Sequence, residues 1–238
     1  MRIKIELFVG SVLFFCFLVT GLFGAPMALS SDNRIPLQGS ETGENIWYGQ
    51  DACANITTGT GNSFFGRAAG FSTTTGTDNS FFGRGAGVTN TEGNENSFFG
   101  VYAGNDNITG HSNCFFGWGA GRKNNTGYSN SFFGRNAGLS STTGSNNSFF
   151  GRAAGYSNTI QGNNSFFGQG AGSNNTGGSD NAFFGQAAGW NNSSGSYNTF
   201  IGQEAGQSAD NPLTGGSNVF VGQRTGWKNT SGHSNTFL

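Results

Sequence analysis

Apolar and polar residues recur along this chain with a period of 17, which is neither the alternation of a simple strand nor a helical period. The repeating unit reads Asn-Ser-Phe-Phe-Gly-x-x-Ala-Gly, followed by a stretch rich in Ser, Thr, Asn and Gly. Its first residue, here position 1, recurs as Asn45, Asn62, Asn79, Asn96, Asn113, Asn130, Asn147, Asn164, Asn181, Asn198, Asn218 and Asn235. Every interval is 17 residues except one of 20, after Asn198. A unit this short is too small for a helical hairpin and suits one coil of a β-solenoid.

We therefore expect an all-β fold, a parallel β-solenoid (β-roll) of about twelve 17-residue coils over residues 45–238. Each coil should hold two short strands, at Asn-Ser-Phe-Phe and around Ala-Gly-x-x, joined by turns at the glycines. Stacking at about 4.8 Å would align identical side chains, with asparagines hydrogen-bonded and phenylalanines stacked along the axis. The three extra residues after Asn198 should bulge from a turn without breaking the register.

Positions 3 and 4 of the repeat are both large and apolar in every coil. Because adjacent side chains of a strand point to opposite faces, one of the two columns should face outward. A corner at position 4 that tucks both rings inside is the alternative. An exposed column about 55 Å long would form a strip of several hundred Å², at or beyond what a soluble monomer normally leaves uncovered, so we expect lateral self-association. The candidate assembly residues are Trp47, Tyr48, Phe64, Phe65, Phe81, Phe82, Phe98, Phe99, Phe115, Phe116, Phe132, Phe133, Phe149, Phe150, Phe166, Phe167, Phe183 and Phe184.

The two ends of the repeat region suggest a second contact between subunits. Residues 32–238 number 207, which is twelve coils of 17 plus three, and the chain stops at position 4 of a coil. We expect subunits to stack end to end in continuous register, which would grow a filament. The expected junction residues are Asn235, Thr236, Phe237, Leu238 and Cys53. For Cys53, a cross-link between subunits and an idle thiol both remain open.

Residues 1–30 have the features of a secretory signal peptide. Arg2 and Lys4 precede an apolar run over residues 7–23, and Ala28-Leu29-Ser30 fits a small-x-small cleavage site. An uncleaved anchor is the alternative. Residues 31–44 would follow as an N-terminal segment that forms a partial coil. We therefore expect a protein that is secreted, extracellular or on the cell surface, with no membrane span in the mature chain.

The charge and the reactive residues point away from several functional classes. The formal net charge is −1, so no broad field attracts nucleic acid or an anionic membrane. His111 and His233 share one column but lie several coils apart, and no Ser or Thr has a neighbouring His and carboxylate. We expect no enzyme, no catalytic residues, no cofactor and no metal site. Cys53 and Cys114 are roughly 19 Å apart along the stack, which is too far for a disulfide.

The repeat unit resembles the Asn-[Ser/Thr]-x-x-Gly-x-x-Ala repeats of trimeric autotransporter adhesin heads and of related bacterial and phage-tail-fibre repeat proteins. The resemblance spans residues 45–238, although the repeat here is 17 residues long rather than the shorter adhesin unit. It implies a parallel β-roll, commonly trimeric, that binds surfaces or host matrix.

These observations favour a secreted structural protein, a self-assembling subunit of an extracellular fibre or surface layer whose main partner is itself. An adhesin head that binds host or surface glycans is the alternative. Arg67, Arg84, Arg135 and Arg152, all at position 6, could bind a surface polysaccharide. A third interpretation, an ice-binding solenoid, rests on threonine-rich segments such as residues 72–75.

Overall fold

The structure is a computed structural model that describes residues 38–39, 44–208 and 211–238. The described residues belong to one compact unit, Pro36–Leu238. The expected signal peptide, residues 1–30, and most of the segment 31–44 lie outside the described residues.

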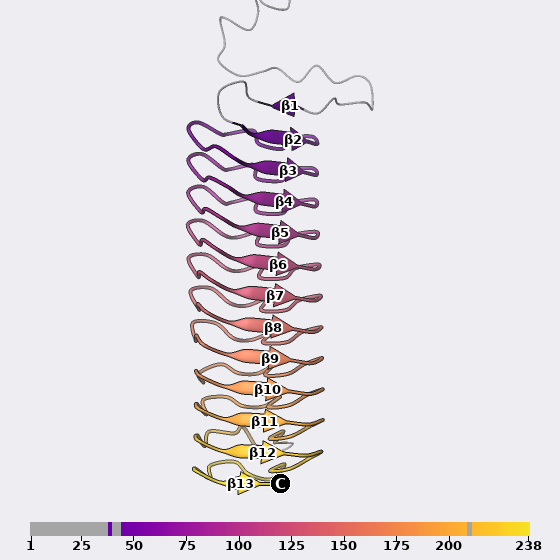
Figure 1. Ribbon diagram of the computed structural model, residues 1–238, viewed down its shortest axis with the longest axis vertical. Helices are drawn as coiled ribbons and strands as arrows, with labels where there is room; N and C mark the ends of the chain where they lie inside the picture. Colours follow the sequence, from indigo (N-terminus) through magenta and orange to yellow (C-terminus); the bar gives the residue numbers. More distant parts are fainter. Residues whose placement is uncertain (1–37, 40–43, 209–210) are drawn as a thin grey trace, which may run out of the picture. The chain divides into compact units, whose positions relative to one another are not determined.

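Strands from successive coils form a single sheet, with one strand per coil (Figure 1). The strands are β1 (Gln38–Gly39), β2 (Ile46–Tyr48), β3 (Ser63–Phe65), β4 (Ser80–Phe82), β5 (Ser97–Phe99), β6 (Cys114–Phe116), β7 (Ser131–Phe133), β8 (Ser148–Phe150), β9 (Ser165–Phe167), β10 (Ala182–Phe184), β11 (Thr199–Ile201), β12 (Val219–Val221) and β13 (Thr236–Phe237). From β2 to β13 every pair is parallel and in register, so that Phe64 pairs with Phe81 and Phe81 with Phe98. The fold is the all-β parallel solenoid that the period predicts.

Each strand ends at the glycine of position 5. These glycines have φ between 124° and 142°, a conformation that side-chain-bearing residues rarely adopt. A Cβ at Gly66 would lie 2.6 Å from the carbonyl oxygen of Gly83 in the next coil. Backbones therefore approach each other more closely here than any other residue would permit, and this contact ends a strand of only three residues.

The second strand expected around Ala-Gly-x-x does not form among the described coils, where positions 6 to 11 are turns. Ala69 N–H donates to Gly66 O at 3.2 Å, and Thr73 N–H donates to Gly70 O at 3.1 Å, closing two successive turns. Ala68 and Gly70 have φ of 55° and 59°, and positive φ at alternate residues prevents an extended backbone. The coils remain bonded without a strand, since Gly70 N–H also donates to Ala86 O at 3.0 Å.

The apolar core consists of two columns, the phenylalanines of position 3 and the alanines of position 8. Each phenylalanine from Phe64 to Phe220 is fully buried, and successive rings stack with centroids 4.8 to 5.0 Å apart. Glycine at position 9 lies against the ring of its own coil. A Cβ at Gly87 would be 2.4 Å from Phe81 Cε2. The small residues at positions 8 and 9 are therefore required by the ring column.

The asparagines of position 1 form a buried ladder along the stack, as expected. Asn79 donates its backbone N–H to Asn62 Oδ1 at 3.0 Å, and its Nδ2 to the same oxygen at 3.0 Å. The Nδ2 group also donates to Gly93 O at 2.8 Å, near the end of its own coil. Each asparagine thus joins two coils and closes its own, which satisfies polar groups that burial would otherwise penalise.

A second asparagine ladder, at position 12, was not foreseen from the sequence. It contains the buried residues Asn90, Asn107, Asn124, Asn158, Asn175 and Asn192. Asn107 Nδ2 donates to Asn90 Oδ1 at 2.6 Å and to Gly110 O at 2.9 Å. The 17-residue spacing of these asparagines was a readable signal, but it lies inside a stretch so rich in polar residues that it resembled a loop.

The three extra residues after Asn198 leave the stack in register. Phe200 pairs with Phe220, and Ile201 pairs with Val221. Leu213 is fully buried and forms an isolated parallel bridge with Asn192 of the preceding coil. The expectation that the register survives this insertion is confirmed.

The N-terminal edge of the solenoid differs from the coils. Gln38 and Gly39 pair antiparallel with Trp47 and Ile46, so β1 runs against the direction of every other strand. These two residues do not extend the parallel stack, and the partial coil expected over residues 31–44 stays a prediction. The edge of β2 that would receive another subunit is occupied by β1.

Candidate functional site

The outward side of the sheet is the candidate site, and here it is called the outer face. It consists of the side chains at positions 2 and 4 of strands β2 to β13. Every three-residue strand from β3 to β9 has a buried central residue and half-buried neighbours on either side. The structure therefore places the position-3 column inside and the position-4 column outside, and the corner that would bury both columns is not found.

The position-4 column is a continuous row of stacked rings. From Phe65 to Phe184 successive centroids are 4.5 to 4.9 Å apart, and neighbouring planes differ by no more than 7°. Tyr48, Phe184 and Ile201 are 39%, 40% and 43% exposed, while the rings between Tyr48 and Phe184 are half-buried by one another. The rings shield their faces along the column and leave their edges open to the side.

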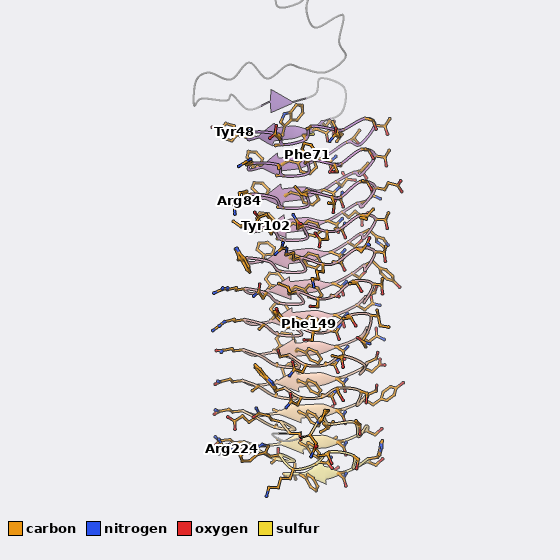
Figure 2. All side chains as sticks on the ribbon, turned by 180° about the vertical axis from the view of Figure 1, so that it is seen from behind. Tyr48, Phe71, Arg84, Tyr102, Phe149 and Arg224 are labelled. Atoms are coloured by element: carbon orange, nitrogen blue, oxygen red, sulfur yellow. The ribbon has the colours of Figure 1, made fainter. Side chains whose placement is uncertain are left out.

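The position-3 members of the expected assembly set lie elsewhere. Phe64, Phe81, Phe98, Phe115, Phe132, Phe149, Phe166 and Phe183 are fully buried, and Trp47 is half-buried against the core. Figure 2 shows Phe149 within the stack, whereas Tyr48 lies along an edge of it. These inner residues hold the coil together and do not contribute to the outer face.

Position 2 lies beside the aromatic column and is small in most coils. In strands β3 to β10 it carries six serines, Cys114 and Ala182. The outer face is thus a row of small side chains next to a row of large rings. Burial raises the pKa of Cys114, which lies half-buried in the row of small side chains.

Charged residues border the outer face on both sides, with opposite signs. Position 6, two residues after the ring column, carries the exposed Arg67, Arg84, Arg135 and Arg152. Position 17, directly before position 1 of the next coil, carries the exposed Glu44, Asp78, Glu95 and Asp180. One border is therefore basic and the other acidic.

The basic side of the solenoid continues beyond position 6. All eight Lys and Arg of the described residues lie between positions 6 and 11. The guanidinium of Arg84 lies 5.1 Å from the ring centroid of Tyr102, and that of Arg122 lies 5.3 Å from the same centroid. Arg84, Tyr102 and Arg224 appear along one edge of the stack in Figure 2.

The expected junction residues lie at opposite ends of the stack. Asn235 Nδ2 donates to Asn218 Oδ1 at 3.0 Å, and Phe237 stacks on Phe220 at 5.0 Å, so the last strand continues both ladders. Among the described strands, β13 pairs with β12 alone. Cys53 lies in the first described coil, buried, and burial raises its pKa to about 12. A protonated, buried thiol is unfavourable for a cross-link between subunits.

Other reactive groups are dispersed over the coils. Within the described residues no three His, Cys, Asp or Glu side chains gather closely enough to form a metal site. His111 stacks on Tyr128 with centroids 5.1 Å apart, while His233 Nδ1 accepts the backbone N–H of Gly216 at 3.0 Å. Both cysteines of the described part are free.

The fold and the outer face define the chain as a parallel β-solenoid repeat protein with a half-exposed aromatic face. No protein-family model, curated protein or solved structure shows significant similarity to it. Nor does the described part of the chain contain a helix of the length and apolarity that a membrane span needs.

Proposed function

We propose that this chain is a secreted structural protein, a subunit of an extracellular fibre or surface layer that assembles through its outer face. The observation that carries the proposal is the stacked ring column with its edges open to the side. Twelve parallel strands at about 4.8 Å spacing span about 53 Å, and the outer face with its basic border, positions 2 to 6, covers about 13 Å, giving roughly 700 Å². This is close to the roughly 800 Å² that each partner contributes to a typical stable interface.

Replacing three rings at the centre of the column tests the lateral contact. The variant carries Phe116→Thr, Phe133→Thr and Phe150→Thr, which keeps strand-favouring residues while removing the rings. In chains that lack Asn235–Leu238, and so lack the end-to-end contact, sedimentation should show a lateral assembly with the native rings and a monomer for the variant, with the β signal of circular dichroism retained. A control with Phe71→Ser and Tyr156→Ser removes exposed rings outside the outer face and should still assemble. A native protein that sediments as a monomer at micromolar concentration would contradict the proposal.

End-to-end stacking is the second part of the proposal, and it requires that β1 leave its place beside β2. β2 is paired with β1 at the edge where another subunit would add. A strand of two residues offers few backbone hydrogen bonds, so an incoming β13 could displace it. A variant that begins at Glu44 should therefore form longer filaments in electron micrographs than the native chain. Removal of Asn235–Leu238 should shorten them, and filaments unaffected by both changes would exclude this contact.

Glycan binding is a second candidate function, favoured by the basic side of the solenoid. Tyr102 lies between Arg84 and Arg122, and an aromatic ring next to guanidinium groups suits an acidic polysaccharide. Retention on a column of a uronic-acid polysaccharide, lost in an Arg84→Gln/Arg122→Gln variant, would support it. Arg67→Gln/Arg152→Gln is the matched control, because it removes the same charge away from Tyr102 and also leaves the contact of Arg135 with Trp118 intact.

A further inference from the structure

We propose that the outer face binds a second copy of this chain in one orientation, with both solenoids running in the same direction about a two-fold axis parallel to the stack. This inference rests on the proposed lateral assembly and specifies its geometry. Two faces of this kind can meet in two simple ways. Either the solenoids run in the same direction, or a two-fold axis perpendicular to the stack makes them run in opposite directions.

The sizes of the side chains distinguish the two orientations. With the two-fold axis parallel to the stack, the position-2 column of each copy faces the position-4 column of the other. Each ring, such as Phe82, then faces a small side chain, such as Ser80 of the partner subunit. In the opposite orientation rings would face rings and serines would face serines, leaving gaps beside overcrowded contacts. Close packing at an interface favours the first arrangement.

The compensating sizes in later coils support the same pairing. In β11 and β12 position 4 shrinks to Ile201 and Val221, while position 2 grows to Thr199 and Val219. A larger residue in one column therefore accompanies a smaller residue in the other. The combined size of a position-4 residue and the position-2 residue that faces it across the dimer stays nearly constant. The first coil departs from this pattern, with Ile46 and Tyr48 beside β1.

The charged borders distinguish the orientations independently. Asp78 lies two residues before β4 and Arg84 lies two residues after it, so the two charges border the same strand. The parallel axis brings Asp78 opposite the partner's Arg84 at the same height, and Arg84 opposite the partner's Asp78. In the opposite orientation each border would face a border of its own sign, which opposes association. β4 is the only described strand with an acidic residue before it and an arginine after it. Gly61, Ser129 and Asn146 precede the other strands that an arginine follows, so the attraction is concentrated at β4 and the coils next to it.

Cysteine cross-linking at two heights tests the orientation. Ser80→Cys and Thr199→Cys are made as single variants, with Cys16 and Cys114 replaced by serine; Cys114 shows that position 2 accepts a cysteine. Packed sheets lie about 10 Å apart, a span that a short bismaleimide bridges. In the proposed dimer each variant should link to itself, because identical coils lie at the same height. A mixture of tagged Ser80→Cys and untagged Thr199→Cys proteins should give no mixed product, since the two cysteines are about 34 Å apart along the stack.

The outcomes separate this inference from the proposed function. Mixed products without self-linked ones would overturn the orientation while leaving lateral assembly in place. The mass of a trimer would overturn the two-fold axis, as would assembly without any linked product. A monomer would overturn the orientation and the proposed lateral assembly together.

Charge reversal gives a readout that does not depend on cross-linking. Arg67→Glu/Arg84→Glu should weaken the dimer roughly tenfold or more in Kd, because each copy would present acidic residues on both borders of its N-terminal coils. Adding Asp78→Arg/Glu95→Arg to the same chain should restore assembly by exchanging the two borders. All four residues are exposed, so the variants should fold like the native protein. Restoration is absent in the opposite orientation, where like borders still meet, and its absence would overturn the inference.

Discussion

Ser141 follows Asn124 in the buried position-12 ladder, and neither Asn124 Oδ1 nor Ser141 Oγ has a hydrogen-bond partner within the described structure. In intact parts of the ladder this amide oxygen accepts the Nδ2 group of the next coil, as Asn107 Oδ1 accepts from Asn124 at 2.8 Å. Serine is too short to make the same contact. The unpaired Asn192 Oδ1 and Thr73 Oγ1 lie in the same column, where Leu213 and Thr73 interrupt the asparagines.

Ser141→Asn should therefore stabilise the protein. The new amide would pair with Asn124 Oδ1, and one restored hydrogen bond contributes about 1 kcal/mol to the free energy of unfolding. The midpoint of urea denaturation should rise. The matched control is Asn107→Ser, which introduces a new break in the same ladder and should lower that free energy by about 1–3 kcal/mol. Equal midpoints for the two variants would show that the ladder does not contribute to stability.

Gly104→Ala should be among the most damaging small substitutions in the chain. Gly104 has φ of 55°, and its added Cβ would lie 2.4 Å from Phe98 Cε2 in a ring column that cannot move aside. Overpacking and the left-handed backbone together should cost about 3 kcal/mol or more. Gly119→Ala is the control, because Ala68 already occupies the same repeat position with φ of 55° and the added Cβ would come within 3 Å only of Asn136 Oδ1, the end of a side chain. The second variant should lose only about 1 kcal/mol, and thermal unfolding followed by circular dichroism measures both.

Truncation of neighbouring rings should have unequal effects. Phe149 is fully buried and Phe150 is half-buried, although the two residues are adjacent. Phe149→Ala should lower the free energy of unfolding by about 3–5 kcal/mol, and Phe150→Ala by roughly half of that or less. The second variant should also reduce assembly, whereas the first should not at concentrations where it remains folded. A reversed order of the two losses would contradict the assignment of inner and outer columns.

The two thiols should differ in reactivity. The pKa of Cys53 is about 12 and its side chain is buried, whereas Cys114 is half-buried in the outer face. At pH 8 iodoacetamide should label Cys114 slowly and leave Cys53 unmodified until the protein is denatured. If the dimer forms as proposed, labelling of Cys114 should slow further as the protein concentration rises.

Stability at alkaline pH should report the same burial. In the unfolded chain the Cys53 thiol ionises near its ordinary pKa of 9.0, whereas in the folded chain it remains protonated up to about 12. As the pH rises, the unfolded chain therefore loses the thiol proton before the folded chain does, and this difference favours unfolding. The stability of the folded state is unaffected below pH 9 and falls progressively as the pH rises toward 12. A Cys53→Ser variant cannot ionise in this range, so its free energy of unfolding should fall less steeply. Parallel slopes for the two proteins would contradict the raised pKa.

The period of 17 was sufficient to predict the fold. A repeat of this length places identical residues at the same point of every coil, so the coils can stack in register. It also predicted the Asn79–Asn62 ladder and the survival of the register after Asn198. The second strand was predicted wrongly because glycine and alanine at positions 7 to 9 read as small strand residues. Positions 7 and 9 have positive φ while the alanine between them does not, and no local pattern reveals this alternation.

The candidate site was only partly predictable. Alternation showed that one aromatic column faces outward, but it could not decide between Phe64 and Phe65, since both are phenylalanine. The Phe64 ring packs directly against Gly70 of the same coil, and this contact identifies position 3 as the inner column. The contact crosses a turn, so it is not visible in the pattern of the strand. The opposite charges of the two borders also become visible only when positions 6 and 17 are placed on either side of the strand.

No contact within the stack depends on how many coils precede it. Each strand pairs only with its immediate neighbours, and the asparagine ladder repeats one step from coil to coil, from Asn62 to Asn45 and from Asn79 to Asn62. Gain or loss of whole repeats could therefore change the length of the protein in steps of about 4.8 Å while every remaining coil keeps the same kind of neighbours. Length in such a protein can evolve separately from the fold.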